Sequence, residues 1–192
     1  MGVVDDLVPV LKKLRLSGVL QTLELRTQEA IDSELSHTEF LLRLLRDEVE
    51  RREAKQVVSR LRKARFEHRR TLQDFDFHFN PSVPKAKVLD LATCGFVGKR
   101  ENVLLVGPTG TGKSHLAQAL GHRAVLAGHT ALFTTADKVF ADLRAARADG
   151  TRDRVLQRFI SPDVFIVDDL GLRPLRDHEP LDLYDLIRGR YE

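Results

Sequence analysis

The feature that most constrains the fold is an apolar run, residues 103–106, that breaks into glycines and then a Lys-Ser pair. Gly107 to Ser114 fit the pattern Gly-x-x-x-x-Gly-Lys-Ser. Between a strand and the start of a helix, this pattern is a phosphate-binding loop. The sequence therefore predicts a nucleotide site in an α/β domain. A glycine-rich turn without a ligand is the alternative.

Each residue type in the loop has a chemical role. Glycines allow positive φ and turn backbone N–H groups onto phosphate oxygens. A helix that opens at Lys113 adds unpaired N–H groups and the positive end of its dipole. Lys113 is expected to contact the β- and γ-phosphates of ATP during catalysis, and the Ser114 hydroxyl to ligate Mg²⁺. The predicted nucleotide-binding residues are Gly107, Pro108, Thr109, Gly110, Thr111, Gly112, Lys113 and Ser114.

A second motif follows about fifty residues later, where the apolar run Val164–Val167 ends in Asp168 and Asp169. A continuously apolar run is typical of a buried parallel strand, whose carboxyl end opens onto the ligand crevice of an α/β sheet. Asp168 is expected to hold the magnesium ion through water. Asp169 is expected to act as the general base on the attacking water. An ordinary strand and turn is the alternative.

Composition and length narrow the class of protein. The 192 residues, 42% hydrophobic, allow one domain of ordinary size with a small appendage. The single cysteine, Cys94, excludes an internal disulfide and a cysteine metal cluster. No stretch approaches the roughly 20 apolar residues of a membrane span, and no secretory signal opens the chain. A cytoplasmic protein without a membrane partner is expected.

Positive charge is concentrated in one segment, residues 46–70, which holds ten Lys or Arg against five Asp or Glu. Several of these cations share a face at helical spacing. They indicate either an electrostatic footprint for nucleic-acid phosphates or a solvated helix face. The candidate DNA-binding residues are Arg60, Arg62, Lys63, Arg65, Arg69 and Arg70.

The pattern of the remaining chain predicts two domains joined by a linker. Residues 1–70 read as a helical DNA-binding domain, in which Ser17-Gly18 breaks a first helical pattern and Ser36–Glu39 forms a capping box for a long helix to about Phe66. Residues 71–86 form the linker, pinned to the next domain by Phe75, Phe77 and Phe79. Residues 87–192 read as alternating helices and strands, hence a parallel sheet. The expected elements are helices at 88–93, 113–127, 136–148, 153–160 and 177–192, and strands at 103–106, 130–135 and 164–167.

With both motifs placed, the chain resembles a known family. Phe75-Asp76-Phe77, the loop Gly107–Ser114 continuing to Gly121, Asp168-Asp169-Leu170-Gly171 and the closing Arg190-Tyr191-Glu192 are similar to the IstB-like ATP-binding proteins. These are AAA+ ATPases that assist insertion-sequence transposases and are related to the DnaC helicase loaders. The resemblance implies a P-loop NTPase fold, ATP and Mg²⁺ as cofactors, double-stranded DNA and a transposase as partners, and assembly into homo-oligomers.

The resemblance also implies that the ATPase domain is incomplete at the C-terminus. Related proteins continue after Arg-Tyr-Glu into a strand with a polar sensor residue, an arginine finger and a final strand. A truncated or frameshifted copy, one half of a split gene, or a shortened form would each fit. This chain is therefore expected to hydrolyse ATP little or not at all. None of the late arginines can be assigned to the finger role: Arg173, Arg176, Arg188 and Arg190.

Three functions follow from these observations. The first is an ATP-binding AAA+ helper for insertion-sequence transposition, which binds DNA and a transposase. The second is a DnaC-like helicase loader in DNA replication. The third is an inactive fragment that binds nucleotide and DNA without turnover.

Overall fold

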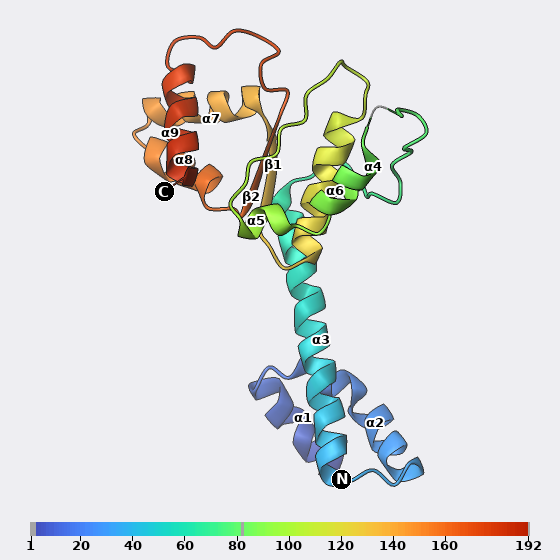
Figure 1. Cartoon of the computed structure of the whole chain (residues 1–192). Helices are drawn as coiled ribbons and strands as arrows, with labels where there is room; N and C mark the ends of the chain where they lie inside the picture. Colours follow the sequence, from blue (N-terminus) through green and yellow to red (C-terminus); the bar gives the residue numbers. More distant parts are fainter. Residues whose placement is uncertain (1–2, 82, 192) are drawn as a thin grey trace. The chain divides into compact units, whose positions relative to one another are not determined.

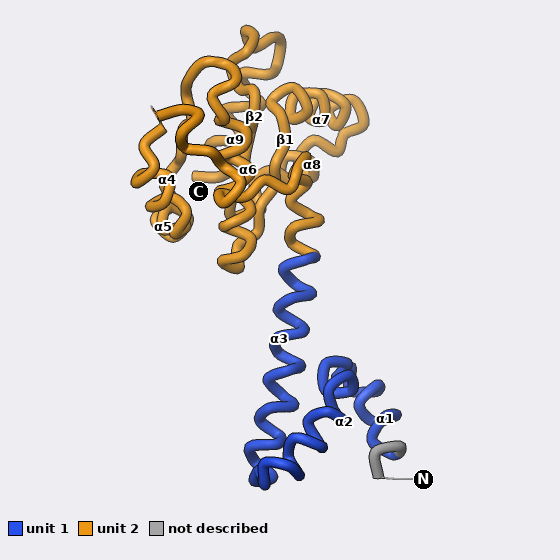
Figure 2. The backbone as a smooth tube through the Cα atoms, turned by 90° about the vertical axis from the view of Figure 1, so that its right-hand side faces the viewer, with its two compact units in different colours: residues 1–58 blue, residues 59–192 orange. Residues whose placement is uncertain are grey.

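The chain folds into two compact units, Met1–Val58 and Ser59–Glu192, in a computed structural model that describes residues 3–81 and 83–191 (Figure 2). From the sequence, the domain boundary is expected after residue 70. The structure instead groups residues 59–70 with the second unit, because buried Ala64 and half-buried Phe66 pack in one cluster with Val125 and Ala131.

No helix within the described ranges is long and apolar enough to cross a membrane.

The first unit consists of the helices α1 (Val3–Lys13) and α2 (Ser17–Asp32) and the start of α3 (His37–Ala64). The predicted capping box is confirmed at the start of α3: Ser36 N–H donates to Glu39 Oε2 at 3.1 Å, and Glu39 N–H donates to Ser36 Oγ at 3.3 Å. A small apolar core joins the three helices through Leu11, Val19, Leu23 and Leu44.

The expectation that Ser17-Gly18 breaks the first helix is wrong. The break comes earlier, at Arg15, which has a left-handed φ of 57°. Gly18 lies in the first turn of α2, where an added Cβ would stand 2.7 Å from the Cα of Glu48. The glycine therefore allows α3 to approach, and its N–H donates to the buried Glu48 carboxylate.

The second unit alternates helices with two parallel strands (Figure 1). Strand β1 (Ala131–Thr135) pairs in register with β2 (Val164–Asp168), from Ala131 beside Val164 to Thr135 beside Asp168. The predicted parallel sheet is confirmed for these two strands. The helices are α4 (Lys85–Leu91), α5 (Gly95–Gly98), α6 (Lys113–Leu126), α7 (Ala136–Ala148), α8 (Arg152–Ile160) and α9 (Glu179–Tyr191).

The predicted strand at residues 103–106 is not formed. This segment pairs with no strand in the described part of the chain, and Leu104 and Val106 are 83% and 90% exposed. An extended segment becomes a strand only when a neighbour takes up its backbone N–H and C=O groups. Among the described residues, the sheet consequently has two strands, β1 and β2.

A network of arginines and carboxylates fixes α9 to the helices before it. Glu179, 3% exposed, accepts from Arg144 on α7 and from Arg173 in the loop after β2. Asp182, 2% exposed, accepts from Arg147 on α7 and Arg152 on α8. Because each buried carboxylate has two guanidinium partners, the network stabilises the unit only while the carboxylates are ionised.

This network predicts acid sensitivity of the second unit. Hydrogen bonds from Arg173 lower the pKa of Glu179 from 4.5 to about 2. A carboxyl group with a lowered pKa contributes stability that is present above its unfolded pKa and is lost as the pH falls through the folded value. We expect the thermal midpoint to fall between about pH 4.5 and pH 2, and more shallowly in Glu179→Gln. Thermal denaturation followed by circular dichroism measures this.

Asp47 in the first unit provides the comparison. Arg26 lowers the pKa of Asp47 to about 2, so Asp47→Asn should alter the acid response of the first unit instead. A Glu179→Gln protein with the same pH profile as the wild type would contradict the role given to this carboxylate.

Candidate functional site

The loop before α6 has the backbone conformation that the glycine pattern predicts. Gly110 and Gly112 have φ angles of 81° and 87°, a region that other residues rarely adopt. Gly112 immediately precedes the first residue of α6, and the first backbone hydrogen bond of the helix runs from Leu116 N–H to the Gly112 carbonyl. The preceding N–H groups, including those of Lys113 and Ser114, are the unpaired donors that open an α-helix. The start of α6 can therefore receive an anion.

The lysine of the motif folds back over the loop. Lys113 Nζ donates to the Pro108 carbonyl at 2.7 Å, and Thr111 Oγ1 donates to the same oxygen at 2.9 Å. The ammonium group thus lies against the start of the loop, where a phosphate oxygen could replace the carbonyl as its acceptor. Ser114 is exposed in the first turn of the helix.

An aromatic contact ties the linker to this loop. A Cβ at position 112 would lie 2.8 Å from the ring of Phe75, so close contact gives Gly112 a second reason to be glycine. Phe75 also packs edge-on against Phe77 and His115, with ring centroids 4.9 and 5.2 Å away. The predicted pinning of the linker is confirmed for Phe75, whereas Phe77 packs against Phe75 within the linker and Phe79 is 74% exposed.

The chain between α3 and this aromatic contact is held by polar side chains of α6. The buried Gln118 Oε1 accepts the N–H groups of Glu67 at 3.1 Å and His68 at 3.3 Å. Nearer the loop, His115 Nε2 lies 3.0 Å from the Thr71 carbonyl. The sequence analysis did not identify Gln118 or His115 as residues that hold this segment. A glutamine among the apolar residues of a helix could have indicated a buried hydrogen-bonding role.

Asp168 and Asp169 stand at the carboxyl end of β2, where the sequence places them. The Asp169 N–H donates to Asp168 Oδ1 at 3.0 Å, and Asp169 has a left-handed φ of 58°. Figure 1 shows the loop before α6 and the chain after β2 at the same end of the sheet. No hydrogen bond joins the loop to either carboxylate within residues 3–81 and 83–191. The magnesium and base roles of this pair remain predictions.

Two late arginines have structural roles in this unit. Arg173 pairs with Asp137 and Glu179. Arg190 on α9 donates from Nη1 to three carbonyls at the end of α8, with distances of 3.2, 2.8 and 2.8 Å to Phe159, Ile160 and Pro162. Both guanidinium groups are therefore occupied with holding α9 in place.

The six candidate DNA-binding cations lie on the last turns of α3 and in the segment after it. The helix ends at Ala64, and Arg65 takes a left-handed φ of 57°. Within the described ranges, none of the six forms an ion pair, whereas several arginines elsewhere pair with carboxylates, as Arg26 does with Asp47 and Arg52 with Glu48. The segment thus carries positive charge that the protein itself does not neutralise.

Comparison with known proteins agrees with these motifs. The profile of the family described as IstB-like ATP binding protein matches residues 9–192. A Mycobacterium tuberculosis protein named as an ATP-binding protein in an insertion sequence is 39% identical over 180 residues, 94% of this chain and 72% of that protein. A Pseudomonas aeruginosa protein named for ATP binding and the insertion sequence IS21 is 37% identical over 187 residues, 97% of this chain and 71% of that protein.

A third relative shows the same agreement. A Geobacillus stearothermophilus protein named for ATP binding and the insertion sequence IS5376 is 34% identical over 158 residues, 82% of this chain and 63% of that protein. The family match includes the phosphate-loop motif, the Asp168-Asp169 pair and the basic segment. The chain belongs to the family of IstB-like ATP-binding proteins.

Proposed function

We propose that this chain binds Mg-ATP and duplex DNA as a helper of insertion-sequence transposition, with a transposase as its protein partner. The loop before α6 is the observation that supports nucleotide binding. Two glycines with a left-handed backbone conformation, the start of the helix and the Lys113 ammonium group come together there. The names of the relatives refer to insertion sequences, which favours transposition over replication as the setting.

Magnesium dependence tests the nucleotide proposal. The Ser114 hydroxyl would ligate a Mg²⁺ ion that bridges the phosphates, and Asp168 would hold the ion through water. Wild-type affinity for ATP should therefore fall when EDTA removes Mg²⁺. In Ser114→Ala the difference between Mg²⁺ and EDTA should be smaller, as isothermal titration calorimetry would measure.

The matched control is Ser161→Ala, which removes a hydroxyl from the same unit outside the phosphate loop. It should keep the wild-type response to EDTA. Equal magnesium dependence in the wild type and in Ser114→Ala would contradict the metal role of this hydroxyl.

Hydrolysis by the chain alone is expected to be slow. Asp169 supplies the general base of the proposal, but phosphoryl transfer also needs a cation on the developing charge. An arginine finger contributes roughly 10³ to 10⁵ in rate where its contribution is known. Arg173 and Arg190 are already engaged in holding α9. We propose that this cation comes from a neighbouring subunit of a homo-oligomer.

Steady-state phosphate release, with and without duplex DNA, tests this expectation. The blank is Asp169→Asn, because asparagine tolerates the left-handed backbone at this position while lacking the basic carboxylate. At protein concentrations where the chain is a monomer, its rate should stay close to the blank. Rapid turnover by the monomer that Asp169→Asn abolishes would contradict the need for a neighbouring subunit.

DNA binding rests on the unneutralised cations after residue 59. Three of them, Arg60, Arg62 and Lys63, lie on the last turns of α3 and three follow the helix. Lysine and arginine side chains that pair with phosphates bind DNA with little dependence on sequence, and the affinity depends strongly on salt. No aromatic platform interrupts this basic run, so duplex DNA suits it better than stacked single strands.

A further inference from the structure

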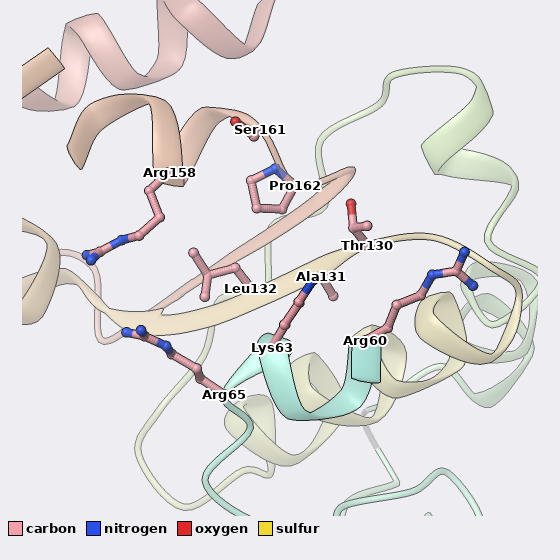
Figure 3. A pocket seen from close by; sticks show the side chains of 9 residues that line it. All are labelled: Arg60, Lys63, Arg65, Thr130, Ala131, Leu132, Arg158, Ser161 and Pro162. Carbon is pink, nitrogen blue, oxygen red and sulfur yellow. The ribbon is translucent and has the colours of Figure 1, made fainter. Parts of the chain in front are cut away.

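A pocket of about 400 Å³ lies beside β1 (Figure 3), and none of its lining residues belongs to the phosphate loop. Lys63 extends from the end of α3 toward Ala131, Arg60 extends to one side of it, and Arg158 extends from α8 on the other side of the strand. Thr130, just before β1, and Ser161, just before β2, line the pocket as well. Both residues precede their strands, so the pocket lies toward the amino ends of the strands. The phosphate loop and Asp168 lie at the opposite, carboxyl end.

The pocket combines an apolar floor with a cationic rim. Ala131, Leu132 and Pro162 supply the apolar surface. The rim has the four cations Arg60, Lys63, Arg65 and Arg158 and no acidic residue. The four come from two separate parts of the fold, and three of them carry no ion pair within residues 3–81 and 83–191.

The fourth cation, Arg158, is held in position without being neutralised completely. It pairs with Asp142 at 2.6 Å, and its guanidinium lies 4.7 Å from the ring centre of Phe159. Asp142 also pairs with Lys138 at 2.6 Å, so one carboxylate serves two cations. A second nearby carboxylate, Asp163, is occupied by the N–H and hydroxyl of Thr130. Net positive charge therefore remains around the pocket.

These features fit a nucleic-acid backbone. Its phosphates pair with cations, and the deoxyribose between them can cover an apolar floor. The cationic run continues outside the pocket through Arg62, Arg69 and Arg70, which suits an extended polyanion better than a single small anion. Resting on the DNA binding proposed above, we infer that this pocket receives the backbone of duplex DNA and that Arg158 of the ATPase unit contacts a phosphate beyond those held by Arg60, Lys63 and Arg65.

This contact extends the proposed DNA site from the basic segment onto α8 and the sheet.

Binding of a short mixed-sequence duplex, measured by fluorescence anisotropy over a salt series, tests the contact. Arg158→Gln should weaken binding several-fold at low salt and reduce the slope of log affinity against log salt by about 0.9, the loss of one phosphate contact. Arg154→Gln, an exposed arginine of the same helix outside the pocket, should leave both quantities unchanged.

A second variant, Asp142→Asn, is expected to have the opposite effect on DNA affinity. Asp142→Asn removes the carboxylate that competes for Arg158, so it should strengthen DNA binding and steepen the salt slope. Nucleotide affinity, measured on the same proteins, should not change, which shows that the unit remains folded.

The outcomes separate the two proposals. Absence of DNA binding by the wild type would overturn the proposed DNA function and this inference with it. Salt-dependent binding by the wild type that Arg158→Gln and Asp142→Asn leave untouched would overturn the pocket alone. An Arg154→Gln effect equal to that of Arg158→Gln would also overturn it, because general charge would then explain both.

Discussion

Lys113→Ala is expected to weaken Mg-ATP binding by about 100-fold or more. The ammonium would donate charge-assisted hydrogen bonds to the β- and γ-phosphates, each contributing about 1.5–3 kcal/mol. Losing two such bonds would lower the affinity for ATP by at least about 100-fold, because each 1.4 kcal/mol or so of binding free energy changes the affinity about tenfold. Lys113 Nζ donates to the Pro108 carbonyl in an exposed hydrogen bond, so its removal should change stability little. Isothermal titration calorimetry with ATP and ADP measures the effect.

Lys87→Ala is the matched control, because this lysine is exposed on α4 and outside the phosphate loop. It should bind ATP as the wild type does. ADP lacks the γ-phosphate, so its affinity should fall less than that of ATP in Lys113→Ala. Equal affinity of the wild type and Lys113→Ala for ATP would refute the assignment of this loop.

The phosphate loop could be predicted from the sequence because its chemistry is local. Positive φ at Gly110 and Gly112 and the helix start at Lys113 depend on a few neighbouring residues. The same holds for the capping box of Ser36 and Glu39, which acts within one helical turn. Strands β1 and β2 were predictable because apolar runs between helices indicate a parallel sheet, and the structure pairs them in register.

Features that depend on contacts distant in sequence could not be predicted in the same way. The apolar run at residues 103–106 has the composition of a strand, but strand formation also needs a partner strand, and this segment pairs with none among the described residues. Gly18 looks like a helix breaker until Glu48, thirty residues away, occupies the space of its missing side chain. The partners of Glu179 and Asp182 on α7 and α8 likewise follow from packing rather than from spacing.

One helix connects the two candidate functional regions of the second unit. The first turn of α6 closes the phosphate loop, and Gln118 and His115 farther along hold the segment that leads from the basic end of α3. Phe75 then brings that segment back onto Gly112. The sequence identifies each region separately by its residue types. That the phosphate loop and the basic segment are both attached to α6 follows from hydrogen bonds, which the residue types alone do not specify.

Duplex DNA affinity is expected to fall steeply with salt. Six phosphate contacts, from the unpaired cations between Arg60 and Arg70, give a slope of log affinity against log salt of about −5. Raising the salt from 50 to 200 mM should therefore reduce the affinity by roughly 10³-fold. Changing Arg60, Arg62, Lys63 and Arg65 together to Ala removes four contacts, so the slope should shrink to about −2. Fluorescence anisotropy with duplexes of different sequence measures both quantities.

A control with equal loss of charge distinguishes a DNA site from general attraction. Lys12, Lys13, Lys99 and Arg100 are exposed cations outside the basic segment, and changing all four to Ala lowers the net charge by the same amount. This control should retain most of the salt slope, because only charges that displace counterions from bound phosphates contribute to it. Because the contacts are to phosphates, the slope should also be similar for duplexes of unrelated sequence. Binding that is independent of salt, or that both quadruple variants weaken equally, would show that the unpaired cations after residue 59 are a solvated surface and not a DNA site.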